Sequence, residues 1–122
     1  MTDHDRLGPL GERLAERHLL SCGYTLLERN WRCAQGEIDL VMRDGEDTVF
    51  VEVKTRAGDG FGHPLEAITA AKLARLRRLA AEWCRGRRES GEVIGRIRID
   101  AVAVIAPRHA PAKIEHLAGI VR

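Results

Sequence analysis

Residues 36–56 read GEIDLVMRDGEDTVFVEVKTR, two runs of alternating apolar and charged residues on either side of a polar turn at 44–47. Alternation with a period of two predicts two half-buried strands, over 37–43 and 48–55. Glycine at the first central position of a two-residue turn favours a type II′ hairpin. With Gly45 and Glu46 as the central residues, the numbers of every opposed pair sum to 91. The stretch therefore predicts an antiparallel hairpin of fixed register.

This register gives the hairpin an apolar face and a charged face. The apolar face comprises Ile38, Leu40, Met42, Val49, Val51 and Val53. We expect this face to pack against the core, because a one-residue slip would expose all of it. On the opposite face Asp39 lies against Glu52, and Glu37 lies against Lys54. We expect Glu37 to pair with Lys54 rather than bind a ligand.

The predicted opposition of Asp39 and Glu52 requires compensation. Directly opposed Cβ atoms are about 5 Å apart, and like charges at that separation destabilise a sheet. One carboxyl group can keep its proton, since a like-charged neighbour raises its pKa. Alternatively, the two acids bind Mg²⁺, with Mn²⁺ as a substitute, and Lys54 stabilises charge developing on a substrate. The plainer alternative is a surface hairpin in which Lys54 neutralises both acids.

The rest of the chain predicts two helices and further strands around the hairpin. Leucine spacing predicts an amphipathic helix over 7–22, and a second apolar stripe over 73–83 predicts a longer helix. The other predicted elements are strands over 24–32, 97–105 and, at an edge, 114–121, and a flexible loop over 57–64. The predicted fold class is α/β, with a central mixed β-sheet flanked by helices in a single domain spanning 1–122.

Length and composition exclude several classes of protein. The chain has 122 residues, of which 44% are apolar, enough for one core but not for two of normal size. Its longest apolar stretch, 101–106, is far shorter than the roughly 20 residues that a bilayer helix needs. We therefore expect a cytoplasmic protein without a membrane partner. The three cysteines include no CxxC pair, which argues against a disulfide framework and a zinc ribbon.

The net charge of +2 is unevenly distributed along the chain. Residues 1–66 carry 8 basic and 13 acidic side chains, whereas residues 67–122 carry 12 basic and 5 acidic ones. This division suggests a basic surface for a polyanion beside an acidic region that holds cations. The candidate contacts to a nucleic-acid backbone are Arg56, Lys72, Arg75 and Arg78. A solvated helix face is the alternative explanation for the helical arginines.

Asp39 followed by Glu52-Val53-Lys54 resembles the Asp…Glu-x-Lys signature of restriction-endonuclease-like nucleases, the PD-(D/E)XK superfamily. The sequences at 36–41 and 50–56 more closely resemble the YraN-type family of small bacterial proteins. The similarity extends from about Gly8 to Leu117. Its further matches are Gly11, Glu12, Ala15, Asn30, Phe61, Gly62, Lys72 and Asp100.

The resemblance implies a nuclease-like core similar to that of archaeal Holliday junction resolvases, and Mg²⁺-dependent cleavage of DNA, including branched or structured DNA. Asp39 and Glu52 match the metal-binding acids, and Lys54 matches the catalytic lysine. Glu12 matches a helix glutamate that completes the metal site. Because one small domain has one active site, cutting two strands requires a homodimer or two successive events. The alternative function is a non-catalytic nucleic-acid-binding or adaptor module on the same scaffold.

Overall fold

The computed structural model describes residues 3–58 and 62–120, with side chains from Leu7 onward. In this part of the chain two α-helices, one short 3₁₀ helix and five strands follow one another. They are α1 Asp3–Ser21, β1 Thr25–Cys33, β2 Gly36–Asp44, β3 Asp47–Arg56, η1 Pro64–Ala67, α2 Ala70–Glu89, β4 Ile97–Ile105 and β5 Lys113–Leu117.

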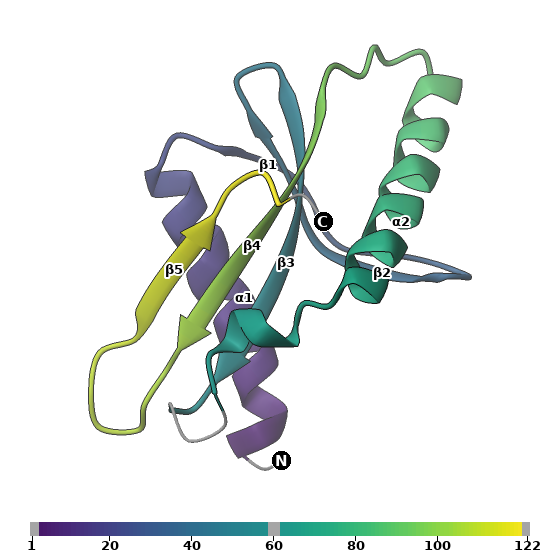
Figure 1. Cartoon of the computed structure of the whole chain (residues 1–122). Helices are drawn as coiled ribbons and strands as arrows, with labels where there is room; N and C mark the ends of the chain where they lie inside the picture. The colour runs from purple at the N-terminus through teal and green to yellow at the C-terminus, as the bar shows by residue number, and fades with distance from the viewer. Residues whose placement is uncertain (1–2, 59–61, 121–122) are drawn as a thin grey trace.

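The strands form one mixed sheet in the order β1-β2-β3-β4-β5. Neighbours are antiparallel except β3 and β4, which are parallel. A parallel pair needs a long crossover connection, and α2 lies within it. Helix α1 covers one face of the sheet and α2 covers the other (Figure 1). This arrangement confirms the predicted α/β class and is compatible with a restriction-endonuclease-like fold.

Each face of the sheet has its own apolar core. On the α1 face, Ala15 and Leu19 pack against alternate residues of the central strands, namely Leu40, Met42, Val49, Val51, Val53, Val102 and Val104. On the α2 face, the Phe50 ring packs edge-on against Trp83, with ring centroids 5.5 Å apart. Strand β4 is buried on both faces from Ile99 to Ile105, as its continuous apolar sequence predicts.

The hairpin register is the predicted one from Asp44↔Asp47 to Leu40↔Val51. Beyond Leu40 the prediction is wrong, because the described β2–β3 pairing ends there and Glu37 does not lie against Lys54. Ile38 also packs under α2, on the face opposite to Leu40. A local contact accompanies this change: the backbone N–H of Val53 donates to the Asp39 carboxylate, at 2.9 Å.

A buried carboxylate ties the C-terminal segment to the sheet. Asp100 on β4 is fully buried, and its oxygens lie 3.1 Å from Tyr24 Oη, 2.9 Å from Arg98 Nε, 2.7 Å from His116 Nε2 and 2.9 Å from the Gly119 backbone N. Burial alone would raise its pKa, but the hydrogen bonds from Arg98, Gly119 and His116 hold the pKa below its ordinary value. Full pairing makes burial of this charge tolerable.

Two predicted segments differ in extent from the structure. Strand β5 ends at Leu117 rather than continuing to 121, because Gly119 adopts a left-handed φ of 66° and turns its N–H toward Asp100. Part of the predicted loop, residues 59–61, lies outside the described residues. Among the described residues, no helix has the length and apolar character needed to cross a membrane.

Helix α1 approaches β3 most closely at Gly11. A Cβ atom at this position would lie 2.8 Å from Cγ2 and 2.9 Å from Cβ of Thr55, and closer still to its Oγ1. Real Cβ atoms do not tolerate such contacts, so glycine is required here for packing. Because Glu12 is the next residue, this contact fixes where its side chain leaves the helix.

We expect Gly11→Ala to lower the free energy of unfolding by about 1–3 kcal/mol, because the added methyl group forces α1 away from β3. Gly8→Ala is the matched control on the same helix, since a Cβ there meets nothing within 4 Å. This control should be neutral or slightly stabilising, since alanine favours helix. Urea unfolding of both variants measures the difference, and equal effects would contradict the packing role of Gly11.

Candidate metal centre

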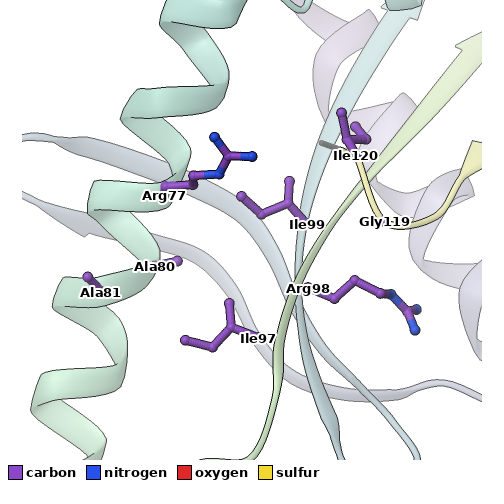
Figure 2. A pocket seen from close by; sticks show the side chains of 8 residues that line it. All are labelled: Arg77, Ala80, Ala81, Ile97, Arg98, Ile99, Gly119 and Ile120. Atoms are coloured by element: carbon purple, nitrogen blue, oxygen red, sulfur yellow. The ribbon is translucent and has the colours of Figure 1, made fainter. Parts of the chain in front are cut away.

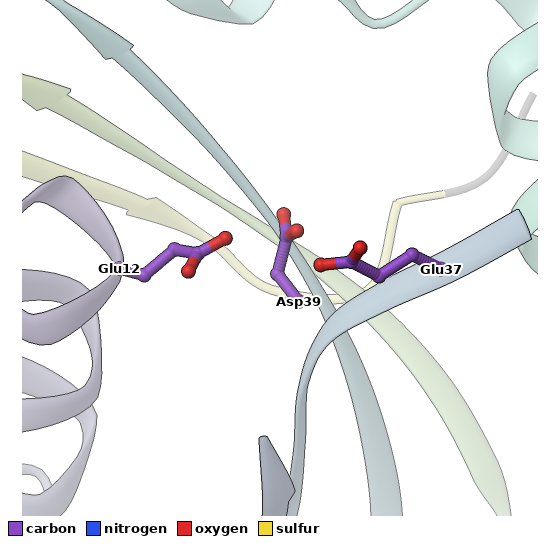
Figure 3. Close-up of side chains that lie close together, drawn as sticks. All are labelled: Glu12, Glu37 and Asp39. Carbon is purple, nitrogen blue, oxygen red and sulfur yellow. The ribbon is translucent and has the colours of Figure 1, made fainter. Parts of the chain in front are cut away.

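Three carboxylates meet beside the point where β2 separates from β3. Glu12 projects from α1, and Glu37 and Asp39 project from β2, with Asp39 between the other two (Figure 3). One oxygen atom from each residue lies within 4.8 Å of the others. All three side chains are half-buried, so solvent only partly screens their mutual repulsion. A proton or a cation is needed to relieve it.

Asp39 is the central and strongly perturbed carboxyl group of this cluster. Burial raises its pKa well above the usual range, and the negative charges of Glu52 and Glu12 raise it further. The hydrogen bond from the Val53 N–H acts in the opposite direction. Without a cation, Asp39 therefore keeps its proton at a pH where a surface aspartate is ionised.

Glu52 and Lys54 lie next to this cluster on β3. The Lys54 Nζ atom is 3.2 Å from Glu52 Oε1, and both side chains are largely shielded from solvent. Glu52 is outside the closest group of three acids, although its charge acts on Asp39. The four residues predicted for the catalytic and metal site, Glu12, Asp39, Glu52 and Lys54, are thus brought to one region of the structure.

Glu37 belongs to the cluster although it was predicted to pair with Lys54. Its carboxylate instead accepts a hydrogen bond from Arg32 Nε at 2.9 Å. A signal for this role exists in the sequence, because Glu37 lies two residues before Asp39 and alternate residues of a strand project from the same side. The predicted pairing across the hairpin concealed that signal.

Asn30 on β1 connects two of the acids. Its amide nitrogen donates to Glu12 Oε2 at 3.1 Å and to Glu37 Oε1 at 3.2 Å. Asn30 has a positive backbone φ of 48°, and among the described residues every other positive φ belongs to a glycine. Asparagine adopts this left-handed conformation more readily than most residues, and such conformations concentrate at functional sites. The amide supplies partial positive charge between two carboxylates in the absence of a cation.

The donor set fits a hard divalent cation. The three clustered side chains offer carboxylate oxygens, and Mg²⁺ and Mn²⁺ prefer oxygen ligands. Mg²⁺ commonly takes one or two protein carboxylates and completes its coordination with water and substrate phosphate. The half-buried position of the acids and the raised pKa of Asp39 both indicate carboxyl groups that repel one another when ionised, a repulsion that a bound cation would relieve.

The residues predicted to bind nucleic acid come from two different elements of the fold. Arg56 ends β3, while Lys72, Arg75 and Arg78 lie on α2. Arg75 and Arg78 are exposed and Lys72 is half-buried. Helix α2 covers the face of the sheet opposite to α1, which carries Glu12. Their role in binding DNA remains a prediction.

A hollow of about 380 Å³ lies between α2 and β4, away from the acidic cluster. Figure 2 shows Ile97 and Ile99 facing this hollow from β4, while Arg98 points away from α2. Arg98 instead pairs with Asp44, Asp47 and Asp100. The residues lining the hollow include no carboxylate, histidine or cysteine, so it offers no acid–base or metal-binding group comparable to those around Asp39.

A five-stranded mixed sheet between two helices is an α/β architecture compatible with a restriction-endonuclease-like fold, and the acids cluster where two of its strands separate. The model of the uncharacterised protein family UPF0102 matches residues 11–104, and the chain belongs to this family, which is the YraN family expected from the sequence.

Similar proteins of this family occur in several bacteria. A UPF0102 protein of Clavibacter michiganensis subsp. michiganensis is 54% identical over 94% of this chain and 95% of its own length. A UPF0102 protein of Beutenbergia cavernae is 53% identical over 98% of this chain and 99% of its own length. A UPF0102 protein of Leifsonia xyli subsp. xyli is 53% identical over 99% of this chain and 100% of its own length.

Asp39→Asn should stabilise the metal-free protein at pH 8 by about 1–3 kcal/mol and abolish stabilisation by Mg²⁺. The folded-state pKa of Asp39 lies above its unfolded value. The wild-type protein therefore loses stability as pH rises from about 4 through the raised pKa, whereas the variant does not. Urea unfolding at pH 4, 6 and 8, with and without Mg²⁺, measures both effects.

Asp47→Asn is the control of opposite sign, because hydrogen bonding to Arg96 lowers the pKa of Asp47. This variant should lose stability at neutral pH, and the loss should fade as pH falls through the lowered pKa. A severe loss of metal-free stability in Asp39→Asn would show that the Asp39 carboxyl group is structural.

Variants of Asn30 separate its amide from its backbone conformation. Asn30→Gly tolerates a positive φ but removes the shared donor, so we expect a loss of about 1–3 kcal/mol. Asn30→Asp adds a carboxylate, so its loss should be larger at pH 8 than at pH 5, and Mg²⁺ should restore more stability than in the wild type. Thermal unfolding at both pH values tests this, and identical pH profiles for the two variants would refute the bridging role.

Proposed function

We propose that this protein is a divalent-metal-dependent endonuclease that hydrolyses phosphodiester bonds in DNA. The observation that carries the proposal is the position of the Asp39 carboxyl group, which lies between those of Glu12 and Glu37. Burial raises the pKa of Asp39, and the negative charge of Glu52 raises it further. A lysine adjoins these acids. Perturbed acids grouped with a cationic side chain are typical of catalytic sites, because reaction requires charges that a stable fold would otherwise avoid.

In this proposal Asp39, Glu12 and Glu52 hold the cation, with Glu37 as a further acid in reach. When bound, Mg²⁺ polarises a phosphate oxygen and lowers the pKa of the attacking water. Asp39 gives up its proton on binding, while the Val53 N–H keeps one of its oxygens in place. The Asp39 carboxylate is therefore oriented by the sheet before the ligand arrives, which reduces the cost of assembling the site.

Lys54 has a separate role at the same site. Glu52 holds its ammonium group at 3.2 Å, next to the acidic cluster. From there Lys54 stabilises negative charge that develops on the phosphate, or orients the water that attacks it.

DNA as the substrate and a second copy of the chain as a partner both belong to the proposal. One copy supplies one group of clustered acids, so cleavage of both strands of a duplex needs a dimer or two successive encounters. Branched DNA with symmetric arms suits a symmetric pair of sites for the same reason.

A cleavage panel tests the proposal. Purified protein should cut at least one of duplex, nicked or four-way-junction DNA with Mg²⁺ or Mn²⁺, and should cut none with a chelator. Glu52→Gln and Lys54→Ala should each lower the rate by about 10²–10³-fold, since each removes a charge used in the transition state. Gel analysis of radiolabelled DNA measures the rates.

Glu46→Gln and Lys113→Ala are matched controls at exposed positions away from the cluster, and should keep full activity. Cutting that persists unchanged in Glu52→Gln would reveal a contaminating nuclease. Absence of metal-dependent cutting on every substrate, together with salt-sensitive DNA binding, would contradict catalysis and support the adaptor alternative.

A further inference from the structure

A groove leads away from the acidic cluster between α1 and β1. Its first part, about 180 Å³, begins at Glu12 and Asn30 of the metal site. Its second part, about 380 Å³, continues along α1 past Arg17 and the exposed Leu20. Arg13, Glu16 and Arg29 line both hollows, so the two hollows adjoin each other, and together they are termed here the α1–β1 groove.

The α1–β1 groove presents more positive than negative charge. Arg13 and Arg17 are exposed and four residues apart on α1, so they lie on the same side of the helix. Within the described residues, neither makes an ion pair with a carboxylate. Arg29 faces them from β1. Its Nε atom and one terminal guanidinium nitrogen each donate a hydrogen bond to the Glu16 carboxylate, and the bond from the terminal nitrogen is 2.8 Å long. Glu16 is therefore neutralised, and two arginines remain available to an anion.

The basic residues of α2 are arranged differently. Arg85 pairs with Glu82, and Arg87 pairs with Glu28 and Glu92. Arg75 and Arg78 are exposed but line none of the hollows described above, and their helix covers the opposite face of the sheet. Arg13 is exposed and directly follows Glu12 in the sequence. It also lines the hollow that begins at Glu12.

We propose that the α1–β1 groove binds the sugar–phosphate backbone of DNA on one side of the bond that is cut at the acidic cluster. This inference rests on the proposed nuclease function. Guanidinium groups bind phosphate oxygens with two parallel hydrogen bonds. Arg13 and Arg17 are separated by about 6 Å along the helix, close to the axial length occupied by two phosphates of one strand. A strand in the groove leads directly past Glu12 to Asp39.

A paired comparison of charge deletions tests the groove. Arg13→Ala/Arg17→Ala removes two exposed arginines from α1, and Arg85→Ala/Arg88→Ala removes two exposed arginines from the C-terminal part of α2. Binding to duplex and four-way-junction DNA is measured without divalent cations at several salt concentrations. The α1 pair should weaken binding at low salt at least tenfold and lower the slope of log affinity against log salt by about 2. The α2 pair should leave the slope unchanged, and both should unfold at the wild-type temperature.

A third variant should act in the opposite direction. Glu16→Gln removes the carboxylate that occupies Arg29, so Arg29 becomes available to phosphate. Affinity should rise, and the salt slope should steepen by about 1. A loss of affinity in Glu16→Gln would contradict the assignment of Arg29 to the groove.

The outcomes separate this inference from the proposed function. If the wild-type protein binds DNA but the α1 pair keeps its salt slope, the groove assignment is wrong and the nuclease proposal stands. Equal losses in the α1 and α2 pairs would indicate a diffuse basic surface and also overturn the assignment. If the wild-type protein shows no salt-dependent binding to either DNA, both the groove and the nuclease proposal fail.

Discussion

Electrostatic repulsion among carboxylates at the separation of β2 and β3 is the constraint on which the rest of the structure depends. The chain brings Glu12, Glu37 and Asp39 together from a helix and a strand, although each would be better solvated apart. Three different contacts hold them there: the glycine packing of α1 on β3, the Val53 N–H on Asp39, and the Asn30 amide. The two apolar cores of the sheet supply the stability that makes this arrangement tolerable.

Two aspartates of the same sheet illustrate how environment assigns different roles to one residue type. Asp100 is the more deeply buried, yet its pKa is lowered because Arg98, His116 and the Gly119 N–H surround it. Asp39 receives one backbone hydrogen bond and two negative neighbours, so its pKa is raised. The first carboxylate is fully compensated by the protein and acts as a structural anchor. The negative charge of the Asp39 carboxylate is compensated only in part, and partly compensated, strongly perturbed acids are typical of binding and catalytic sites.

The fold and the centre of the site followed from the sequence because both depend on local pattern. Period-two alternation and the turn glycine predicted the hairpin register correctly as far as Leu40 and Val51. The prediction failed at Asp39 because it extended the same register along the whole hairpin, whereas the β2–β3 pairing ends at Leu40 and the Val53 N–H donates to the Asp39 side chain. The assumed register paired Glu37 with Lys54, and for that reason Glu37 was missed as a member of the cluster.

Long-range placement was harder to predict than strand pairing. Charge counts favoured the basic second half of the chain, but they carry no information on which helix covers which face of the sheet. The position of Arg13 relative to β1 depends on how α1 docks on the sheet, and the contact between Gly11 and Thr55, which lie in segments far apart in sequence, contributes to that docking. Asn30 likewise gave no sign of its backbone conformation in isolation.

The parallel pairing of β3 with β4 has a consequence for how the chain reaches its native state. The β2–β3 hairpin closes through a two-residue turn, whereas β4 joins only after the crossover containing α2 has folded back across the sheet. Local contacts form faster than contacts between distant segments. Glu52 and Lys54 lie on β3, which pairs with β2 across a short turn and with β4 across a long crossover. We therefore expect the hairpin to form before the region around these two residues becomes rigid.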